Sequence, residues 1–371
     1  MIRVQHITSL DEFESLAQEW DRLVLASRFP TPMLLHDWAS CWLRTVGKAY
    51  APAVIAVWES DQLAAVAPLC RRRLHLGPVP ALHELRTLGA AGVSGMYFDF
   101  PVHAQASKHA RQALLQALHQ MPQWHRLRLE RMTPGSQLLD ACQHGTLFGD
   151  TVTECRQDVP CPVLPLPDTM AELEAGMDPV FRAILRRKNL KIAPSRHAVA
   201  FVPAIPAETL DADLTRLFQV HTARWTHMGH AGEFANADRT QFFIDLAHRL
   251  HAKGWLRFSK LLLDGEGHCF VYGVQLGDQY FGLQTGISPE GLACHAGIYN
   301  MYQLMQHLLP TASRFHFMEG DESYKFKWGA MPQMSYTMQA WHGLRGRAVC
   351  RLRRMRQVVQ AWRAQRAATV E

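Results

Sequence analysis

A run of three strand-like segments in the second half of the chain limits most strongly what this sequence can fold into. The segments Trp255–Leu263, His268–Leu276 and Gln279–Gly286 follow one another with only short turns between them. The turns, at Asp264–Gly267 and Gly277–Asp278, have the length and glycine content of hairpin connections. Strands joined by such turns are antiparallel neighbours. The run therefore predicts an antiparallel sheet in this half.

Predicted helices and further strands on both sides of this run indicate a mixed α/β fold. After the three strands, the sequence predicts a helix over Gly297–Leu309 and a strand over Arg314–Phe317. The first half repeats this order, with a hairpin of Ala53–Trp58 and Leu63–Arg71 and later a helix at Ala104–Gln120. Such alternation is typical of α/β units. Each half is therefore predicted to form one α/β unit with a mixed α+β sheet.

Length and one proline-rich stretch divide the chain. A chain of 371 residues exceeds one ordinary core, so two domains are expected. Residues 156–168 hold four prolines, which is typical of an extended linker. We predict an N-terminal domain at 1–160, a second domain at 161–342 and a basic C-terminal helix at 343–371. Residues 72–104 are rich in Gly and Pro and are expected to be loop with short strands.

Composition predicts a cytoplasmic globular protein. Apolar residues make up 48% of the chain and charged residues 19%, which excludes an intrinsically disordered chain. The eight cysteines are scattered without a CxxC pair, a pattern that favours reduced thiols over disulfides or a zinc site. The N-terminus has no apolar signal-peptide region, and the longest apolar run, Ala53–Trp58, is far too short to span a membrane.

The net charge of +6 is concentrated near the C-terminus. Eight arginines and no acidic residue lie between Arg345 and Arg366. The same predicted helix carries an apolar stripe of Leu344, Ala348, Leu352, Met355, Val359 and Trp362. We expect the stripe to pack on the body of the protein, and a peripheral contact with the inner membrane face or with a synthase is the alternative. Charge confined to one end does not indicate DNA as a partner.

The stretch Phe315–Gly329 combines a strand with a dense polar turn. Its sequence, FHFMEGDESYKFKWG, breaks at Gly320 and then carries two carboxylates, a tyrosine and two lysines. A sheet fixes where such a turn points, so the turn is suited to hold a functional site. The alternative is a solvated turn in which Asp321 caps a short helix.

Four segments of the second half carry a resemblance to a known family. They are FRAILRRKNLKIA at 181–193, LFQVHTARWTHMGHAGEF at 217–234, FGLQTGISPEGLACHAG at 281–297 and FHFMEGDESYKFKWG at 315–329. In this order they resemble the acetyltransferase domain of the CelD/BcsL group, also called BioF2-like. That group is a branch of the GNAT superfamily related to the FemABX transferases. The segment at 29–47 is similar to the opening helix pair of the same family.

This resemblance implies tandem GNAT-like domains with the active site in the C-terminal copy. It implies transfer of an acyl group from acetyl-CoA or another acyl-CoA to an amine or hydroxyl. The implied acceptor is a small or glycan-linked polar molecule, because such proteins are often linked to exopolysaccharide or cellulose synthesis. No metal is expected, since His221, His227 and His230 lack a carboxylate or cysteine that would complete a ligand spacing.

A GNAT-type site depends on backbone groups to bind its acyl-CoA. A splayed strand offers an amide to the thioester carbonyl, and a loop at a helix start holds the pyrophosphate. The resemblance places these features at the strand Gln279–Gly286 and at the start of the helix Gly297–Leu309. The cofactor-binding residues that it implies are Gln284, Thr285, Gly291, His295 and Gly297. Cys294 and Tyr299 depart from the first and last positions of the usual pattern, so an ordinary helix start is the alternative.

The predicted substrate-binding residues are basic or aromatic. Arg186, Arg187 and Lys188 lie within one helical turn, where they would hold an anionic acceptor or a phosphate. Arg224 and Trp225 lie near the end of another predicted helix and would face the same cleft. The alternatives are a solvated basic face, a core tryptophan and an arginine that neutralises the helix C-terminus.

The polar turn supplies the predicted catalytic residues. Glu319 and Asp321 are candidates for the general base, because an attacking amine must lose a proton. Tyr324 would protonate the leaving thiolate or orient the acceptor. Lys325 would pair with the carboxylates or offset charge in the tetrahedral intermediate. A structural salt-bridge cluster is the alternative for these residues.

Two other functions are compatible with the sequence. One is FemABX-like transfer from aminoacyl-tRNA, for which the basic clusters at 182–191 and 345–366 would supply a channel. The other is a catalytically degenerate scaffold that binds a synthase or a nucleotide sugar. The departures within residues 294–299 support the scaffold.

Overall fold

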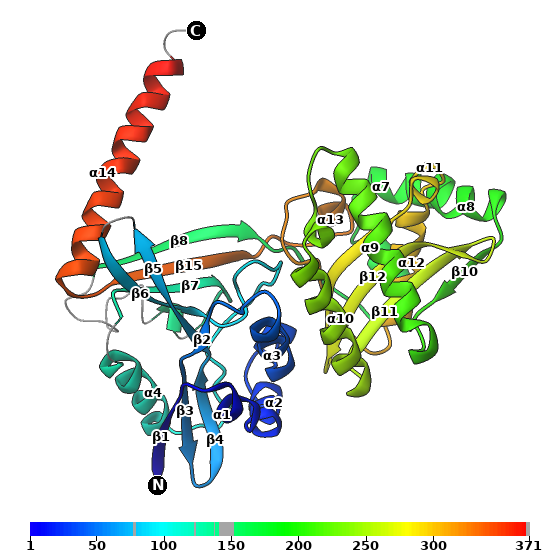
Figure 1. Cartoon of the computed structure of the whole chain (residues 1–371). Helices are drawn as coiled ribbons and strands as arrows, with labels where there is room; N and C mark the ends of the chain where they lie inside the picture. The colour runs from blue at the N-terminus through cyan, green and yellow to red at the C-terminus, as the bar shows by residue number, and fades with distance from the viewer. Residues whose placement is uncertain (77–78, 122–123, 137, 141–151, 369–371) are drawn as a thin grey trace.

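Two six-stranded mixed sheets and one three-stranded sheet organise the molecule (Figure 1). The structure is a computed structural model and describes residues 1–76, 79–121, 124–136, 138–140 and 152–368. The two large sheets lie in different parts of the molecule, and the long C-terminal helix projects away from the sheet that contains β5 to β8 (Figure 1). The predicted fold class, mixed α/β, is confirmed.

The first half holds the small sheet and most of one large sheet. Its elements are β1 (Ile2–Ile7), α1 (Leu10–Glu14), α2 (Ala17–Leu25), α3 (His36–Arg44), β2 (Ala51–Pro52), β3 (Val54–Glu59), β4 (Gln62–Ala67), β5 (Leu69–Leu76), β6 (Val79–Thr87), α4 (Lys108–Gln120), β7 (Arg126–Met132) and β8 (Val152–Pro160). A capping box begins α1, since Ser9 accepts from the Glu12 amide while the Glu12 carboxylate accepts from the Ser9 amide.

The second half holds the other large sheet and its covering helices. Its elements are β9 (Val163–Pro165), α6 (Met170–Ala175), α7 (Pro179–Ile184), α8 (Leu190–Arg196), β10 (Val199–Val202), α9 (Leu210–His227), α10 (Ala237–Ala252), β11 (Leu256–Leu263), β12 (Glu266–Leu276), β13 (Gln279–Ile287), α11 (Pro289–Ala293), α12 (Ala296–Leu308), β14 (Arg314–His316), α13 (Ser323–Lys327), β15 (Met334–Trp341) and α14 (Gly343–Ala368).

The three strands predicted for the second half form successive hairpins. β11 pairs antiparallel with β12, and β12 pairs antiparallel with β13. β14 then adds to β13 in parallel, with α12 as the crossover between them. The complete order of this sheet is β10-β11-β12-β13-β14-β9.

The two large sheets exchange strands across the middle of the chain. β15 pairs with both β7 and β8, so the last strand of the chain lies inside the first-half sheet. In the opposite sense, β9 closes the second-half sheet by pairing with β14. The predicted boundaries 161–342 put β15 in the second domain, and the pairing corrects this placement. The expected proline-rich linker is also two strands, and the chain crosses between sheets at Cys161 and Pro162.

The expected loop at 72–104 is in part a long hairpin. β5 and β6 pair from Leu69↔Thr87 to Leu76↔Val79. The sequence does not predict this strand pair, because several of its charged side chains are buried and form ion pairs within the sheet. Glu84 is fully buried and forms ion pairs with Arg72 at 2.9 Å and Arg126 at 3.0 Å. A paired buried charge breaks the apolar pattern from which strands are predicted.

One hydrophobic core runs through both halves. α3 is buried along almost its whole length, with its tryptophan Trp38 against Phe242 of α10 at a ring distance of 4.9 Å. Lys253, just after α10, forms ion pairs with Asp21 at 2.6 Å and Asp37 at 2.5 Å. The halves are therefore joined by packed side chains as well as by exchanged strands.

Helix α14 packs on the body only at its start and then extends alone (Figure 1). Cys350 is buried, and Arg354 pairs with Glu154 of β8 at 2.8 Å. Leu344, Leu352 and Met355 of the apolar stripe are 86%, 56% and 56% exposed. The expectation that this stripe packs on the body is therefore wrong for its described residues. No helix among the described residues is long and apolar enough to cross a bilayer.

Candidate active site

The parallel strands β13 and β14 separate partway along their length. Their pairing covers Gln279↔Arg314, Tyr280↔Phe315 and Phe281↔His316. Beyond Phe281, β13 continues to Ile287 with only β12 as a partner among the described residues. The family resemblance implies a splayed strand at Gln279–Gly286, and the separated part of β13 overlaps that range. Its free edge presents backbone groups that a ligand can bind.

A bulge re-aims β13 where the separation begins. Tyr272 faces Gln284 and the next residue, Gly273, faces Gly282, so Leu283 is the extra residue. Bulges bend a strand and turn its side chains, and they are common beside active sites. After the bulge the Gln284 side chain is buried, whereas Thr285 is exposed.

The start of α12 lies directly beyond the open end of β13. His295 has left-handed backbone geometry, with φ 57°, and it turns the chain into the helix. No described residue accepts a hydrogen bond from the amides of Ala296 or Gly297. A Cβ on Gly297 would lie 2.8 Å from Ile287 Cδ1, so glycine lets the helix start approach the strand. These free amides at a helix start suit an anion.

Gly291 lies apart from this group of amides. It is buried inside α11, and its amide donates to Ser288 Oγ at 3.0 Å. A Cβ there would meet Ile287 at 3.1 Å and Cys269 at 3.3 Å. The structure thus uses Gly291 for close packing and helix capping, and its amide is not available to a phosphate.

The polar turn after β14 is held by a buried lysine. Lys325 Nζ donates to the Glu319 carbonyl at 2.6 Å and pairs with the Glu322 carboxylate at 2.8 Å. Lys325 is only 3% exposed, while Glu319, Asp321 and Glu322 are exposed. The salt-bridge alternative therefore describes Lys325, whereas the two candidate bases keep their carboxylates at the surface.

An arginine from the first half also reaches this turn, and no pattern in the sequence indicates this contact. Arg131 lies within β7, where the pairing with β15 is irregular, and has left-handed backbone geometry. Its side chain donates to the carbonyls of Val93 and Gly95 at 2.8 and 3.1 Å. Another of its nitrogens lies 3.8 Å from a Glu319 carboxylate oxygen. No local pattern marks Arg131, because its neighbours in the turn come from the other half of the chain.

Tyr324 and Arg224 lie close together beside the turn. Tyr324 is 38% exposed and meets Phe317 edge-on at 6.1 Å. Burial of the ring, with the nearby Glu322 charge, raises the pKa of Tyr324 to about 12, and the Arg224 charge opposes this shift. Trp225 is 36% exposed, so it is no core residue. Its neighbour His221 is buried, and burial lowers the pKa of His221 to about 4.

In the predicted basic turn, Arg186 forms an ion pair, whereas Arg187 and Lys188 are exposed. It lies between α7 and α8, where Leu185–Asn189 form a wider helical turn. Arg186 binds the buried Glu174 carboxylate, which also accepts from Tyr302 of α12 at 2.8 Å. Arg187 and Lys188 are exposed, without an ion pair to any described residue. Arg186 thus fixes this turn to α12, and the other two remain available to a ligand.

Known proteins resemble the part of the chain that holds this arrangement. Residues 180–326 match the family model described as an acetyltransferase (GNAT) domain. The matched part is therefore similar to a GNAT acetyltransferase domain. It includes the separated strands β13 and β14, the start of α12 and the turn with Tyr324. No curated protein matches the chain.

Solved structures share the fold over nearly the whole length of the chain. FemX is 14% identical, with a TM-score of 0.60, and the match covers 91% of this chain and 96% of FemX. A conserved protein of unknown function from Bacteroides thetaiotaomicron is 12% identical, with a TM-score of 0.55 and coverage of 92% and 100%. The C-terminal DUF2156 domain of a candidate lysylphosphatidylglycerol synthetase from Agrobacterium fabrum is 12% identical, with a TM-score of 0.53 and coverage of 91% and 95%. At these identities the likeness concerns the fold.

Proposed function

We propose that this chain is a GNAT-type N-acyltransferase that takes its acyl group from acetyl-CoA or another acyl-CoA. The observation that carries the proposal is the separation of β13 from β14 beside the free amides of Ala296 and Gly297. The strand edge would hold the thioester and the helix start the pyrophosphate. Both features lie within the part of the chain that matches the GNAT model.

The side chains around the turn have the chemistry for transfer to an amine. Glu319 or Asp321 takes the proton of the attacking nitrogen as its bond to the thioester carbon forms. The carbon–sulfur bond then breaks, and Tyr324 can protonate the leaving thiolate. A pKa of about 12 keeps the Tyr324 hydroxyl protonated at neutral pH. Arg187, Lys188, Arg224 and Trp225 border this region as candidates to bind the acceptor.

A pair of substitutions at one position tests the binding of acyl-CoA. Gly297→Gln and Gly297→Glu add side chains of equal size, and both must displace Ile287. Only Gly297→Glu adds a negative charge beside the proposed pyrophosphate. We expect Gly297→Glu to bind CoA and acetyl-CoA about tenfold more weakly than Gly297→Gln, in calorimetric titration. Equal affinities in the two variants, or no binding by the parent chain at about 1 mM, would reject this site.

Substitution of the carboxylates tests the base. We expect either Glu319→Gln or Asp321→Asn to lower kcat by about 10²–10⁴-fold, with loss of the acid limb of the pH profile. The assay follows release of free thiol from acetyl-CoA with a panel of amino sugars as acceptors. Near-normal kcat in both variants places the base elsewhere. Binding of acyl-CoA with no turnover on any acceptor would favour the catalytically degenerate scaffold.

The acceptor that we propose is a polar amine or hydroxyl, sugar-linked and connected with exopolysaccharide synthesis. This part rests on the resemblance to the CelD/BcsL group and on exposed basic residues that suit an anionic acceptor, such as Arg187 and Lys188. Amino sugars carrying a phosphate should therefore be better acceptors than neutral ones. Equal turnover of phosphorylated and neutral amino sugars would contradict the proposal that Arg187 and Lys188 bind the acceptor.

Transfer from aminoacyl-tRNA is the second candidate function. It is favoured by the basic helix α14, which extends free of the body and carries arginines without acidic residues up to Ala368 (Figure 1). FemX, whose fold this chain shares, belongs by name to the FemABX transferases. Retention of tRNA that falls steeply with salt, together with no response to acyl-CoA, would favour this function.

A further inference from the structure

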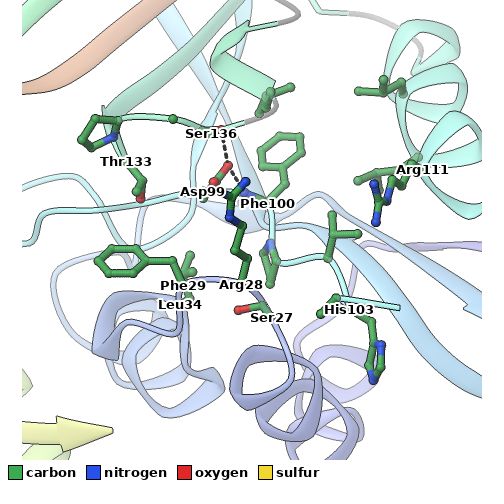
Figure 2. Close-up of a pocket in the computed structure, with 18 of the residues that line it drawn as sticks. Ser27, Arg28, Phe29, Leu34, Asp99, Phe100, His103, Arg111, Thr133 and Ser136 are labelled. Atoms are coloured by element: carbon green, nitrogen blue, oxygen red, sulfur yellow. Dashed lines mark hydrogen bonds between the residues drawn. The ribbon is translucent and has the colours of Figure 1, made fainter. Parts of the chain in front are cut away.

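The first half contains a cavity of its own, separate from the candidate active site. Its volume is about 650 Å³, which is within the range of small-molecule sites. Its walls come from the loop after α2, the segment 99–104, helix α4 and residues 133–136 after β7 (Figure 2). Arg314 and Gln333 from the second half complete the lining. None of the residues assigned to acyl transfer borders it.

The cavity occupies a defined place in the topology of the first half. β6 and β7 are parallel neighbours over Glu84↔Arg126 to Arg86↔Arg128, and α4 is the crossover between them. In the second half, β13, α12 and β14 form the same parallel unit. The cavity lies beyond the carboxyl end of β7 and beside α4. Ligands of α/β sheets bind at such ends, because loops and helix termini converge there.

Two arginines, Arg28 and Arg111, enter the cavity from different elements. Figure 2 shows Arg28 extending through the middle of the cavity toward Asp99, while Arg111 enters from α4. Neither guanidinium has an ion pair or hydrogen bond to a described residue, and Arg111 Nε is buried without a partner. An unpaired buried donor is costly, so an acceptor from a ligand would be favourable.

Asp99, the carboxylate among the described lining residues, accepts hydrogen bonds from neutral donors. Asp99 accepts from Ser136 Oγ at 2.6 Å and from the Phe100 amide at 2.8 Å (Figure 2). Within the described part of the chain, it forms no ion pair with Arg28 or Arg111. The cavity therefore has excess positive charge, which favours an anionic ligand.

The remaining walls are largely apolar. They are formed by the side chains of Phe29, Leu34, Phe100, Leu114 and Leu138. Phe29 and Leu34 lie on one side of Arg28, and Phe100 lies close to Asp99 (Figure 2). A ligand that fills such a cavity needs an apolar body as well as a charged group.

We propose that this cavity binds an amphiphilic anion, a carboxylate or phosphate attached to an apolar body. Arg28 and Arg111 bind the anionic group, and the leucine and phenylalanine walls bind the apolar body. The first half is then a ligand-binding unit in its own right. The binding does not depend on acyl transfer in the second half.

Calorimetric titration of the full chain with three matched probes tests the proposal. Octanoate and octyl phosphate carry the two possible anions on the same apolar chain, and octanamide is the neutral control. We expect at least one anion to bind at about 1 mM or below, and about tenfold more tightly than octanamide. The preference between octanoate and octyl phosphate distinguishes a carboxylate ligand from a phosphate. Equal binding of octanamide and both anions, or no binding of any probe, would overturn the proposal.

Variants locate the binding. Arg28→Gln replaces an exposed side chain, so this variant should fold normally. Arg28→Gln and Arg111→Gln should each weaken the binding of the preferred anion about tenfold. Arg22→Gln, on the outer face of α2, is the matched control and should bind as the parent does. Leu115→Trp should fill the cavity and abolish binding, with circular dichroism confirming the fold. Unchanged anion affinity in Arg28→Gln and Arg111→Gln would refute this site, whereas acetyl-CoA affinity should be the same in all of these variants.

Discussion

The charged residues of the candidate site have different roles, and the sequence alone distinguishes only some of them. The stretch Phe315–Gly329 was predicted to form a site because it crowds charged groups after a strand. The structure keeps Glu319 and Asp321 exposed there, but it buries Lys325 as an anchor. Arg186 was predicted to bind an acceptor, yet its guanidinium binds Glu174. Residue type predicted the chemistry, whereas burial, which depends on distant packing, decides which groups are free.

Loss of the Lys325 charge should loosen the turn. Lys325→Met removes the hydrogen bond to the Glu319 carbonyl and the ion pair with the half-exposed Glu322. We expect the free energy of unfolding to fall by about 1–3 kcal/mol, measured by urea denaturation. Lys327→Met, at an exposed site two residues away, is the control and should change it by less than about 0.5 kcal/mol. Similar losses in both variants would contradict the anchoring role.

Asp99 should give the protein a distinct pH dependence. Burial raises the pKa of Asp99 from 3.8 to about 6, against hydrogen bonds from Ser136 and Phe100 that lower it. The native state therefore keeps this proton at a pH where the unfolded chain has released it. Between about pH 4 and 6 the native state binds more protons, so stability falls as pH rises, by at most about 3 kcal/mol.

Asp99→Asn removes this titration and serves as the comparison. Urea midpoints of the parent and the variant, measured from pH 4 to 7, should diverge up to about pH 6 and then run parallel. As the pH rises, the stability of the variant should increase relative to that of the parent. Parallel curves across the whole range would show that Asp99 titrates normally.

At the scale of elements, the sequence was informative wherever strand pairing is local. The hairpins β11–β12 and β12–β13 follow from short turns between strands, and the structure confirms them. The hairpin β5–β6 was missed, because Arg72 and Glu84 interrupt its apolar pattern while pairing with each other. The partners of β15 were also not predictable, since β7 and β8 lie far away in the chain and no periodicity encodes such a pairing.

Removal of β15 should disrupt the first half, although β15 comes from the other end of the chain. A chain ending at Pro332 leaves β7 and β8 without the strand between them. We expect loss of the cooperative unfolding transition and exposure of the apolar core, measured by circular dichroism and dye binding. A chain ending at Met355 keeps β15 and the packed start of α14, and it should unfold as the full chain does. Native-like unfolding of the shorter chain would contradict the strand exchange.

At the scale of the whole molecule, two halves of similar topology act as one packed body with one projecting arm. Trp38 against Phe242 and Lys253 against Asp21 join the halves through their cores. The candidate active site depends on this union, because Arg131 of the first half lies near Glu319 of the second. Beyond its first turns, helix α14 does not pack on the two halves, so it is accessible to a partner (Figure 1).

We propose that α14 associates with anionic membrane surfaces, and vesicle flotation tests this. The full chain should float with vesicles that contain anionic lipid, and the bound fraction should fall with salt. A chain ending at Met355 lacks Arg356, Arg363 and Arg366, so at about 1 kcal/mol for each arginine it should bind roughly 100-fold more weakly. Neutral vesicles are the control. No flotation of the full chain with anionic lipid would end the proposal.

The position of β15 also determines when this protein can fold during its synthesis on the ribosome. About 170 residues separate the end of β8 from the start of β15. At roughly 5–20 residues per second, the ribosome needs about 9–35 s to make them. Throughout that time, the nascent first half has β7 and β8 with open edges facing the gap that β15 will fill. Unpaired edges of this kind recruit other chains. A nascent-chain chaperone, or slow and sparse initiation of translation, would therefore benefit this protein more than one whose first sheet is complete when it emerges.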